Sequence, residues 1–218
     1  MYRAVIFDLD GTLLNTLEDL RDGVNHVLDA NGYAERSLEE IRTFVGNGIG
    51  KLIERAVPEG TDEKICAEVL RQFRVYYTGH CRIKTCPYDG VIELLKYLKE
   101  HGYLMAIVSN KNDAAVKELV KYYFADDVEV AIGEREGIQK KPAPDSVFEA
   151  MRLLGVSKEE TVYVGDSEVD RETAANAGLD CISVTWGFRD ELILRNLKPE
   201  YLVHKPEEVI QIVGKKAE

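Results

Sequence analysis

Two pairs of aspartates have the type and spacing of a reactive site. Asp8 and Asp10 come directly after a short apolar run, and Asp166 and Asp170 follow a second one. Apolar runs rich in Val and Ile are typical of strands buried on both faces. Carboxylates are costly to gather in one place unless a cation neutralises them. The two pairs therefore predict a site that binds a hard metal ion and acts on a phosphate group.

Other polar residues also follow predicted strands. Ser109 and Asn110 come after the strand predicted at 104–108, and Lys141 lies in the loop after the strand predicted at 128–132. Ligands of open parallel sheets bind at the carboxyl ends of the strands. We therefore expect these residues and the two acidic pairs to meet at one edge of a sheet.

Phosphoryl transfer needs each of these groups. A carboxylate can attack phosphorus and form an aspartyl-phosphate, and a second can exchange protons with the leaving oxygen and with water. We assign Asp8 as the nucleophile and Asp10 as the acid/base. Magnesium prefers carboxylate oxygens and water, so Asp166 and Asp170 are its expected ligands, with Asp8 and the carbonyl of Asp10.

The remaining polar groups fit the phosphoryl oxygens. Ser109 and Asn110 would hold phosphate through hydrogen bonds, and Lys141 would balance its charge. Gly11 would let the turn after the first strand adopt a positive φ.

Each piece also has a plainer interpretation. The sequence from Asp8 to Gly11 could be a turn that ends a strand, and Ser109-Asn110 could be the capped start of a helix. Lys141 could lie in a solvated loop, and the segment from Gly165 to Asp170 could join a strand to a helix. These interpretations do not explain why all the pieces share one edge, so we favour catalysis.

The elements that position these residues alternate between strands and helices. Such alternation predicts an α/β fold with a doubly wound, Rossmann-like parallel sheet. A weaker strand is predicted at 201–203, and Pro144 is expected to open a helix. The five stronger strands are predicted at Ala4–Phe7, Leu104–Val108, Val128–Ile132, Thr161–Val164 and Cys181–Val184.

The connection after the first strand is unusually long. It has about 70 residues, against about a dozen for a minimal crossover. It contains three helical patterns and no clear strand, and Ser37 with Glu40 fits a capping box. We therefore predict a catalytic core of residues 1–14 and 85–218 with a helical cap domain of residues 15–84.

Composition narrows the class of protein. The chain has 218 residues, of which 45% are hydrophobic, and a formal net charge of -11, which argues against a nucleic-acid-binding surface. No apolar run is long enough to span a membrane, and we expect no signal peptide, because residues 1–3 lead directly into the first predicted strand. The four cysteines lack a CxxC spacing, so we expect reduced thiols in a cytoplasmic protein. We also expect a monomer or a homodimer. Residues 215–218 are predicted to be a frayed end.

These motifs resemble those of the haloacid dehalogenase superfamily of phosphatases, which implies a Rossmann-like core and a small cap inserted after the first motif. Its four motifs match this chain in order and span most of it. They correspond to Asp8-Leu9-Asp10-Gly11-Thr12, Ser109, Lys141, and Gly165-Asp166-Ser167-Glu168-Val169-Asp170.

Within the superfamily the chain is most similar to phosphoglycolate phosphatases. Val45-Gly46-Asn47-Gly48 resembles their cap loop, and Ser109-Asn110-Lys111 also fits. The resemblance implies a small phosphorylated metabolite as substrate, 2-phosphoglycolate first, with magnesium as cofactor. Thr12, Gly46, Asn47 and Asn110 are the expected substrate-binding residues. For the carboxylate of this substrate the candidates are Asn47, Lys51, the loop N–H groups, or Arg189 on the core side.

Several alternatives stay open. An inorganic pyrophosphatase, another small-metabolite phosphatase and a phosphosugar mutase share the same core motifs, and a non-catalytic binding protein could keep the fold. Dehalogenases of the superfamily use an aspartate without a metal, and Asp10, Asp166 and Asp170 argue against that chemistry. Arg171 departs from the small or apolar residue usual at its position, and we expect its side chain to point to solvent.

Overall fold

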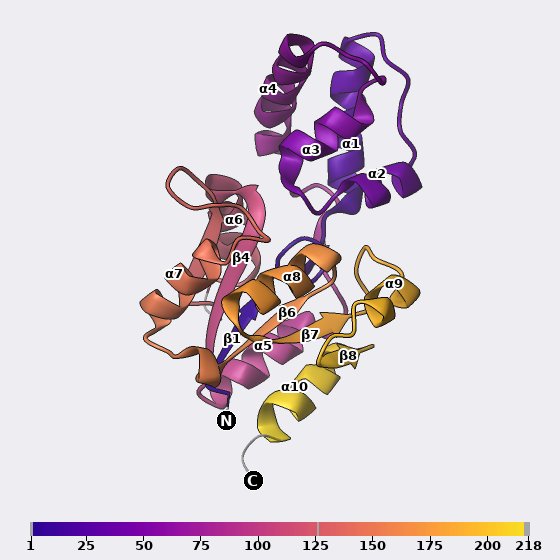
Figure 1. Cartoon of the computed structure of the whole chain (residues 1–218). Helices are drawn as coiled ribbons and strands as arrows, with labels where there is room; N and C mark the ends of the chain where they lie inside the picture. The colour runs from indigo at the N-terminus through magenta and orange to yellow at the C-terminus, as the bar shows by residue number, and fades with distance from the viewer. Residues whose placement is uncertain (1, 126, 216–218) are drawn as a thin grey trace. The chain divides into compact units, whose positions relative to one another are not determined.

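The computed structural model describes residues 2–125 and 127–215, so most of the predicted frayed end lies outside it. The chain forms two compact units (Figure 1). One unit combines Met1–Leu14 with Pro87–Glu218, and the other is Asn15–Cys86. Two short strands, β2 (Leu14–Asn15) and β3 (Cys86–Pro87), pair where the chain passes from one unit to the other.

The larger unit is built on a six-stranded sheet in the order β5-β4-β1-β6-β7-β8, and every described pairing within it is parallel. The predicted fold class is therefore confirmed. The first strand of the chain lies at the centre of the sheet, between β4 and β6. The strands are β1 (Ala4–Phe7), β4 (Leu104–Asn112), β5 (Val130–Glu134), β6 (Thr161–Gly165), β7 (Asp180–Val184) and β8 (Tyr201–Val203).

The strand β4 differs from its prediction in a way that matters for the site. It continues four residues past Val108, and its pairing with β5 is irregular between Val108 and Asn112. Ser109 and Asn110 therefore lie in the irregular end of a strand. The next helix is capped by Asn112, whose side chain accepts a hydrogen bond from the N–H of Ala114.

Helices follow the strands and cover both faces of the sheet (Figure 1). Alternate strand residues such as Ile6 and Tyr163 pack with Val147 and Ala174, which come from α7 and α8. The intervening strand residues point to the other face, where α5 contacts α10. The helices are α5 (Val91–Glu100), α6 (Asp113–Tyr123), α7 (Asp145–Leu154), α8 (Glu168–Ala177), α9 (Glu191–Asn196) and α10 (Pro206–Lys215), with a 3₁₀ turn at Lys158–Glu160.

The smaller unit is helical. The second of the three helical patterns predicted for this segment forms two separate helices, α2 and α3. The chain turns between them at Gly46 and Gly48, which have φ values of +114° and +82°. The predicted capping box between Ser37 and Glu40 is present. Phe73 of this unit is fully buried. The helices are α1 (Leu17–Ala30), α2 (Leu38–Phe44), α3 (Gly48–Ala56) and α4 (Glu63–His80).

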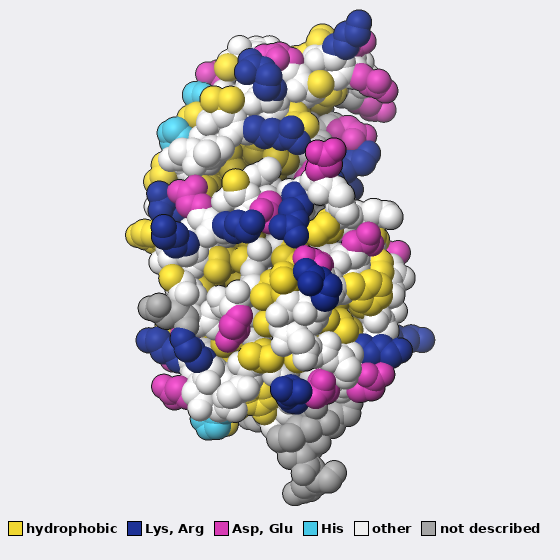
Figure 2. Space-filling view, turned by 90° about the vertical axis from the view of Figure 1, so that its left-hand side faces the viewer, with side chains coloured by type: hydrophobic (Ala, Val, Ile, Leu, Met, Phe, Trp, Pro, Cys, Tyr) yellow, Lys and Arg dark blue, Asp and Glu magenta, His cyan; other side chains and the backbone are white. Residues whose placement is uncertain are grey.

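Charged side chains of both signs are interspersed on the face of the molecule in Figure 2. Several form ion pairs within one helix, such as Arg71 with Glu68 and Arg195 with Glu191. No helix among the described residues is long and apolar enough to cross a membrane. All four cysteines are free thiols.

Candidate active site

Three aspartates meet at the carboxyl edge of the sheet. Asp8 follows β1, Asp166 follows β6, and Asp170 lies in the first turn of α8. One carboxylate oxygen from each lies within 4.8 Å of the others, and all three residues are buried. Because β1 and β6 are neighbours, with Phe7 opposite Val164, the residues that follow the two strands are brought together.

Lys141 joins this cluster from the loop after β5. Its Nζ atom lies 2.8 Å from an oxygen of Asp8 and 2.8 Å from an oxygen of Asp170. The side chain is only 3% exposed, so these ion pairs are shielded from water. Lys141 therefore lies inside the site and not in a solvated loop.

Asp170 is held by four hydrogen bonds. One oxygen accepts from Lys141 Nζ at 2.8 Å and from the hydroxyl of Tyr163 at 2.9 Å. The other accepts from the Oγ and N–H groups of Ser167, at 2.5 and 3.1 Å. Ser167 and Asp170 form a capping box at the start of α8. The protein thus fixes both oxygens of Asp170.

Sequence reasoning missed Tyr163 and Ser167. The spacing of Ser167 and Asp170 is that of a capping box, so Ser167 could have been found. Tyr163 lies within an apolar strand, and its sequence context is the same as that of an ordinary core residue.

The site carries more negative charge than Lys141 balances. Burial and the charge of Asp170 raise the pKa of Asp8 to about 7, although Lys141 opposes the change. Burial, with Asp170 and Asp8, raises the pKa of Asp166 well above its usual range. Burial alone lowers the pKa of Lys141, but Asp170 and Asp8 more than offset it, so that pKa is raised. A buried, all-oxygen donor set with excess negative charge fits a hard cation such as magnesium.

Asp10 lies beside the cluster and is paired with a second buried lysine. Lys111 Nζ lies 2.9 and 3.1 Å from the two carboxylate oxygens of Asp10. The Lys111 side chain is 3% exposed, whereas that of Asp10 is 22% exposed. Asp10 therefore keeps contact with solvent while its orientation is set by an ammonium group of the core.

Glycines allow the backbone to approach Asp166 closely. Gly11 has a φ of +88°, as predicted, and a Cβ at Gly11 would lie 2.4 Å from Oδ2 of Asp166. A Cβ at Gly187 would lie 2.3 Å from Cβ of Asp166. Phe188, the next residue, donates its N–H to Oδ2 of Asp166 at 2.6 Å. The position of Asp166 thus depends on two residues that have no side chain.

Asn110 links β4 to the Lys141 loop. Its amide donates to the carbonyl oxygen of Lys141 at 3.0 Å and accepts from the N–H of Lys141 at 2.8 Å. The buried Oγ of Ser109 accepts from the N–H of Lys111 at 3.2 Å. Thr12 is buried, and its hydroxyl lies 3.5 Å from Oδ1 of Asp166. Thr12 therefore lies against Asp166, Asn110 holds the backbone of Lys141, and Ser109 is bound to Lys111.

The other predicted substrate-binding residues, Gly46 and Asn47, lie in the helical unit. Asn47 precedes α3, and its side-chain oxygen accepts from Arg55 at 2.9 Å. Lys51 is exposed and lies 2.7 Å from Glu54. Asn47 and Lys51 thus both have partners within the helical unit.

Two arginines of the core pair with glutamates. Arg189 binds Glu168 through two nitrogens, at 2.7 and 3.0 Å. Arg171 does not simply point to solvent, because its side chain is 21% exposed and lies 3.0 Å from Glu200. Glu200 also accepts the N–H of Cys181 from β7, so Arg171 connects α8 to the segment before β8.

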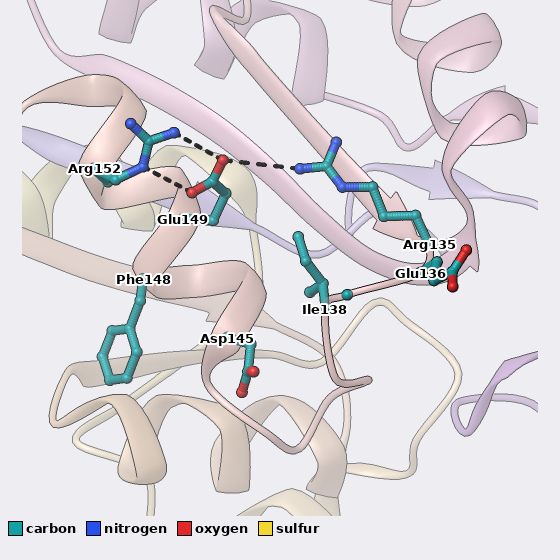
Figure 3. A pocket seen from close by; sticks show the side chains of 8 residues that line it. Arg135, Glu136, Ile138, Asp145, Phe148, Glu149 and Arg152 are labelled. Carbon is teal, nitrogen blue, oxygen red and sulfur yellow. Dashed lines mark hydrogen bonds and ion pairs between the residues drawn. The ribbon is translucent and has the colours of Figure 1, made fainter.

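A separate pocket of about 600 Å³ lies beside α7 (Figure 3). Arg152 binds Glu149 at 2.8 Å, and Arg135 lies 3.9 Å from the same carboxylate. The half-exposed ring of Phe148 lines the same pocket. Both arginines of this pocket thus lie near Glu149, and the carboxylates of the acidic cluster are not among the residues that line the pocket.

Comparison with known proteins identifies the family. Residues 5–184 match the model of the haloacid dehalogenase-like hydrolases. The chain is 34% identical over 203 residues to a phosphoglycolate phosphatase of Mesorhizobium japonicum, covering 91% of this chain and 89% of that protein. It is 32% identical over 217 residues to the pyrophosphatase PpaX of Halalkalibacterium halodurans, covering 98% of each.

Solved structures agree with this relationship. A crystal structure described as a candidate phosphoglycolate phosphatase, from Lactobacillus delbrueckii subsp. bulgaricus, has a TM-score of 0.93 and 35% identity, covering 97% of this chain and 98% of that one. Together with the acidic cluster at the carboxyl edge of a parallel sheet, these matches confirm the predicted superfamily. The chain belongs to the haloacid dehalogenase-like hydrolase family.

Proposed function

We propose that this protein is a magnesium-dependent phosphatase that hydrolyses a small phosphomonoester in the cytoplasm, through an aspartyl-phosphate on Asp8. The observation that carries the proposal is the position of Asp8. It directly follows the central strand β1, contacts Lys141 at 2.8 Å and lies within the buried acidic cluster. A carboxylate beside a fixed ammonium is suited to attack a phosphoryl group whose charge that ammonium balances.

Magnesium would be held by carboxylate oxygens of Asp8, Asp166 and Asp170 and by the carbonyl of Asp10. The oxygen-only donor set and the raised pKa values of Asp8 and Asp166 support this assignment. When bound, the ion neutralises charge that develops on the phosphoryl oxygens.

The reaction follows from two carboxylates with different surroundings. Asp8 attacks phosphorus, and the bond between phosphorus and the leaving oxygen breaks. Asp10 gives that oxygen a proton, then takes a proton from the water that releases phosphate from Asp8. Asp10 is suited to this exchange because it is partly exposed and is oriented by Lys111.

The residues around the cluster would hold the phosphoryl group. Ser109 would donate its hydroxyl to a phosphoryl oxygen, and Thr12 would line the same site next to Asp166. Asn110 would act on phosphate mainly through Lys141, because its amide makes two hydrogen bonds to the backbone of that residue.

The substrate proposed first is 2-phosphoglycolate. Relatives named phosphoglycolate phosphatase are 30 to 36% identical to this chain, and the chain covers most of their length. The helical unit would act as the cap that selects the substrate, with Gly46 and Asn47 in its loop. Pyrophosphate is the second candidate, because the relative named pyrophosphatase PpaX matches over nearly the whole chain.

A side-by-side assay tests the proposal. The purified protein with magnesium is given 2-phosphoglycolate, pyrophosphate and a panel of sugar phosphates, and released phosphate is measured. We expect the highest kcat/KM for 2-phosphoglycolate, and no release by the Asp8→Asn variant with any substrate. A higher kcat/KM for pyrophosphate would favour the second candidate. Equal release by the wild-type protein and the Asp8→Asn variant would contradict the mechanism.

A further inference from the structure

The buried ammonium group of Lys111 lies next to Asp10, the residue proposed to protonate the leaving group. Lys111 comes from the irregular end of β4, and its side chain is 3% exposed. Its Nζ atom is within 3.1 Å of both carboxylate oxygens of Asp10. Removing a lysine ammonium from water is costly, and contact with a carboxylate offsets that cost. The chain therefore holds a cation at this point of the core.

The position of Lys111 relates it to one part of the substrate. In the proposed reaction Asp10 gives a proton to the leaving oxygen, so that oxygen must lie within hydrogen-bond distance of Asp10. Lys111 contacts the same carboxylate, so the group attached to the leaving oxygen emerges next to the ammonium. In 2-phosphoglycolate a single methylene separates the leaving oxygen from a carboxylate.

The other candidate cations are engaged elsewhere. Lys141 contacts Asp8 and Asp170, on the side where the phosphoryl group is transferred. Arg189 binds Glu168 through two nitrogens. Lys111, by contrast, binds both oxygens of the acid/base Asp10.

The geometry points to Lys111 as a specificity-determining residue that binds the carboxylate of the substrate. The inference rests on the proposed function and names the residue that recognises the carboxylate of the substrate, the group beyond phosphate. Lys111 is shared between Asp10 and the bound carboxylate, so a substrate with that carboxylate is held where Asp10 can reach its leaving oxygen. With a substrate that lacks the carboxylate, the Lys111 ammonium binds Asp10 alone.

Two substrates that differ only in this group test the inference. 2-Hydroxyethyl phosphate has a hydroxymethyl group where 2-phosphoglycolate has a carboxylate. Lys111→Gln is expected to lower the ratio of kcat/KM for 2-phosphoglycolate to kcat/KM for 2-hydroxyethyl phosphate by about 10- to 100-fold, the range for a hydrogen bond to a charged group. The loss should fall mainly on KM, and Lys111→Arg should restore part of the ratio. Lys99→Gln, on the exposed side of α5, is the control and should leave the ratio unchanged.

The outcomes separate the two claims. If the wild-type protein does not hydrolyse 2-phosphoglycolate, the proposed substrate is wrong and the inference falls with it. If the wild-type protein is active and Lys111→Gln lowers both activities by the same factor, Lys111 only positions Asp10 and the inference alone is overturned.

A second measurement applies if Lys111→Gln does not fold. In a crystal of the wild-type protein with magnesium and 3-phosphonopropionate, a non-hydrolysable analogue, Lys111 Nζ should lie within hydrogen-bond distance of the analogue's carboxylate. A carboxylate bound by other residues would overturn the inference.

Discussion

The Nζ atom of Lys141 lies 2.8 Å from Oδ1 of Asp8, and both side chains are almost fully removed from solvent. The contact places a fixed positive charge against the proposed nucleophile. The ammonium favours the ionised form of Asp8, whereas burial and Asp170 favour the protonated form. The reactivity of Asp8 therefore depends on the balance between Lys141 and the surrounding carboxylates.

Replacing the nucleophile should abolish turnover without unfolding the protein. Asp8→Asn keeps the shape of the side chain but removes the attacking anion, so kcat should fall by at least about 10⁴-fold. Phosphate release and the thermal midpoint are measured for the same preparation. Mass spectrometry of the rapidly quenched wild-type protein should find phosphate on Asp8. Phosphate on another residue would refute the assignment.

Replacing the acid/base should affect poor leaving groups most. Asp10→Asn cannot protonate an alkoxide, and such help is typically worth about 10²–10⁴-fold. Formation of the aspartyl-phosphate should slow strongly with an alkyl phosphate and little with p-nitrophenyl phosphate, while its hydrolysis slows with both. Rapid-quench kinetics measure the two steps. An equal loss of the first step for both substrates would contradict the role of Asp10.

Removing divalent metal should remove activity. EDTA should abolish phosphate release, and magnesium should restore it, because the donors are carboxylate and carbonyl oxygens. Calcium should restore little activity, since it accepts more ligands and a looser geometry than in-line transfer requires. Full activity in a sample shown by elemental analysis to lack metal would be incompatible with this prediction.

A methyl group at Gly11 should disturb the site beyond its effect on the backbone. Gly11→Ala strains a residue with a φ of +88° and also places a Cβ 2.4 Å from Oδ2 of Asp166. Gly102→Ala is a matched control, because Gly102 has a φ of +78° and no atom within 4 Å of the added group. Both variants should lose about 1–3 kcal/mol of stability from backbone strain.

The two variants should then differ in metal dependence. Gly11→Ala should require several times more magnesium for half-maximal activity, because Asp166 must move, whereas Gly102→Ala should match the wild-type protein. Magnesium titrations of activity measure the difference. The same magnesium requirement in both variants would mean that Asp166 tolerates the added group.

Ionised Asp113 should stabilise the fold in a way that depends on pH. This residue begins α6 and is remote from the acidic cluster in sequence. Its carboxylate accepts the N–H of Gly133 at 2.9 Å and lies 2.6 Å from Lys117. Burial opposes the change, but these partners lower the pKa of Asp113 below its usual value. The folded pKa is the lower one, so this stabilisation is present above the unfolded pKa of about 3.9 and is lost as the pH falls through the folded value.

Asp113→Asn isolates that effect, because the amide oxygen can still accept from Gly133. The variant should be less stable at pH 7 by about 1 kcal/mol, which corresponds to a fall of roughly 2–4 °C in Tm. The difference should shrink as the pH falls below about 4. Thermal melts at pH 7, 5 and 3 measure it. A difference that grows towards low pH would have the wrong sign for a lowered pKa.

The fold could be predicted because its signals are local and repeated. The apolar strands that hold Ala4 and Thr161 begin where the sequence predicts, and the alternation with helices fixes a parallel sheet. The end of β4 could not be predicted, because the irregular pairing beyond Val108 depends on β5. The break between α2 and α3 depends on the backbone conformation at Gly46.

The acidic cluster could be predicted because its residues all follow strands of one parallel sheet. The contacts of Lys111 and Tyr163 could not, because they depend on how the strands and loops pack in three dimensions. Lys111 reaches Asp10 across 101 positions, and Tyr163 resembles any aromatic core residue until its hydroxyl meets Lys141. The catalytic roles of Asp8 and Asp10 remain predictions for the experiments above.

The central place of β1 has a consequence for how the chain folds during synthesis. Ala4 pairs with Leu104 on one side and with Thr161 on the other. Because β1 is synthesised before both neighbouring strands, its two edges stay uncovered until residue 161 and beyond have been made. Contacts of such long range slow folding, and an apolar strand with open edges can pair with another chain. The helices of residues 15–86 lie between β1 and β4 in the sequence. They can form from local contacts before the parallel sheet is complete.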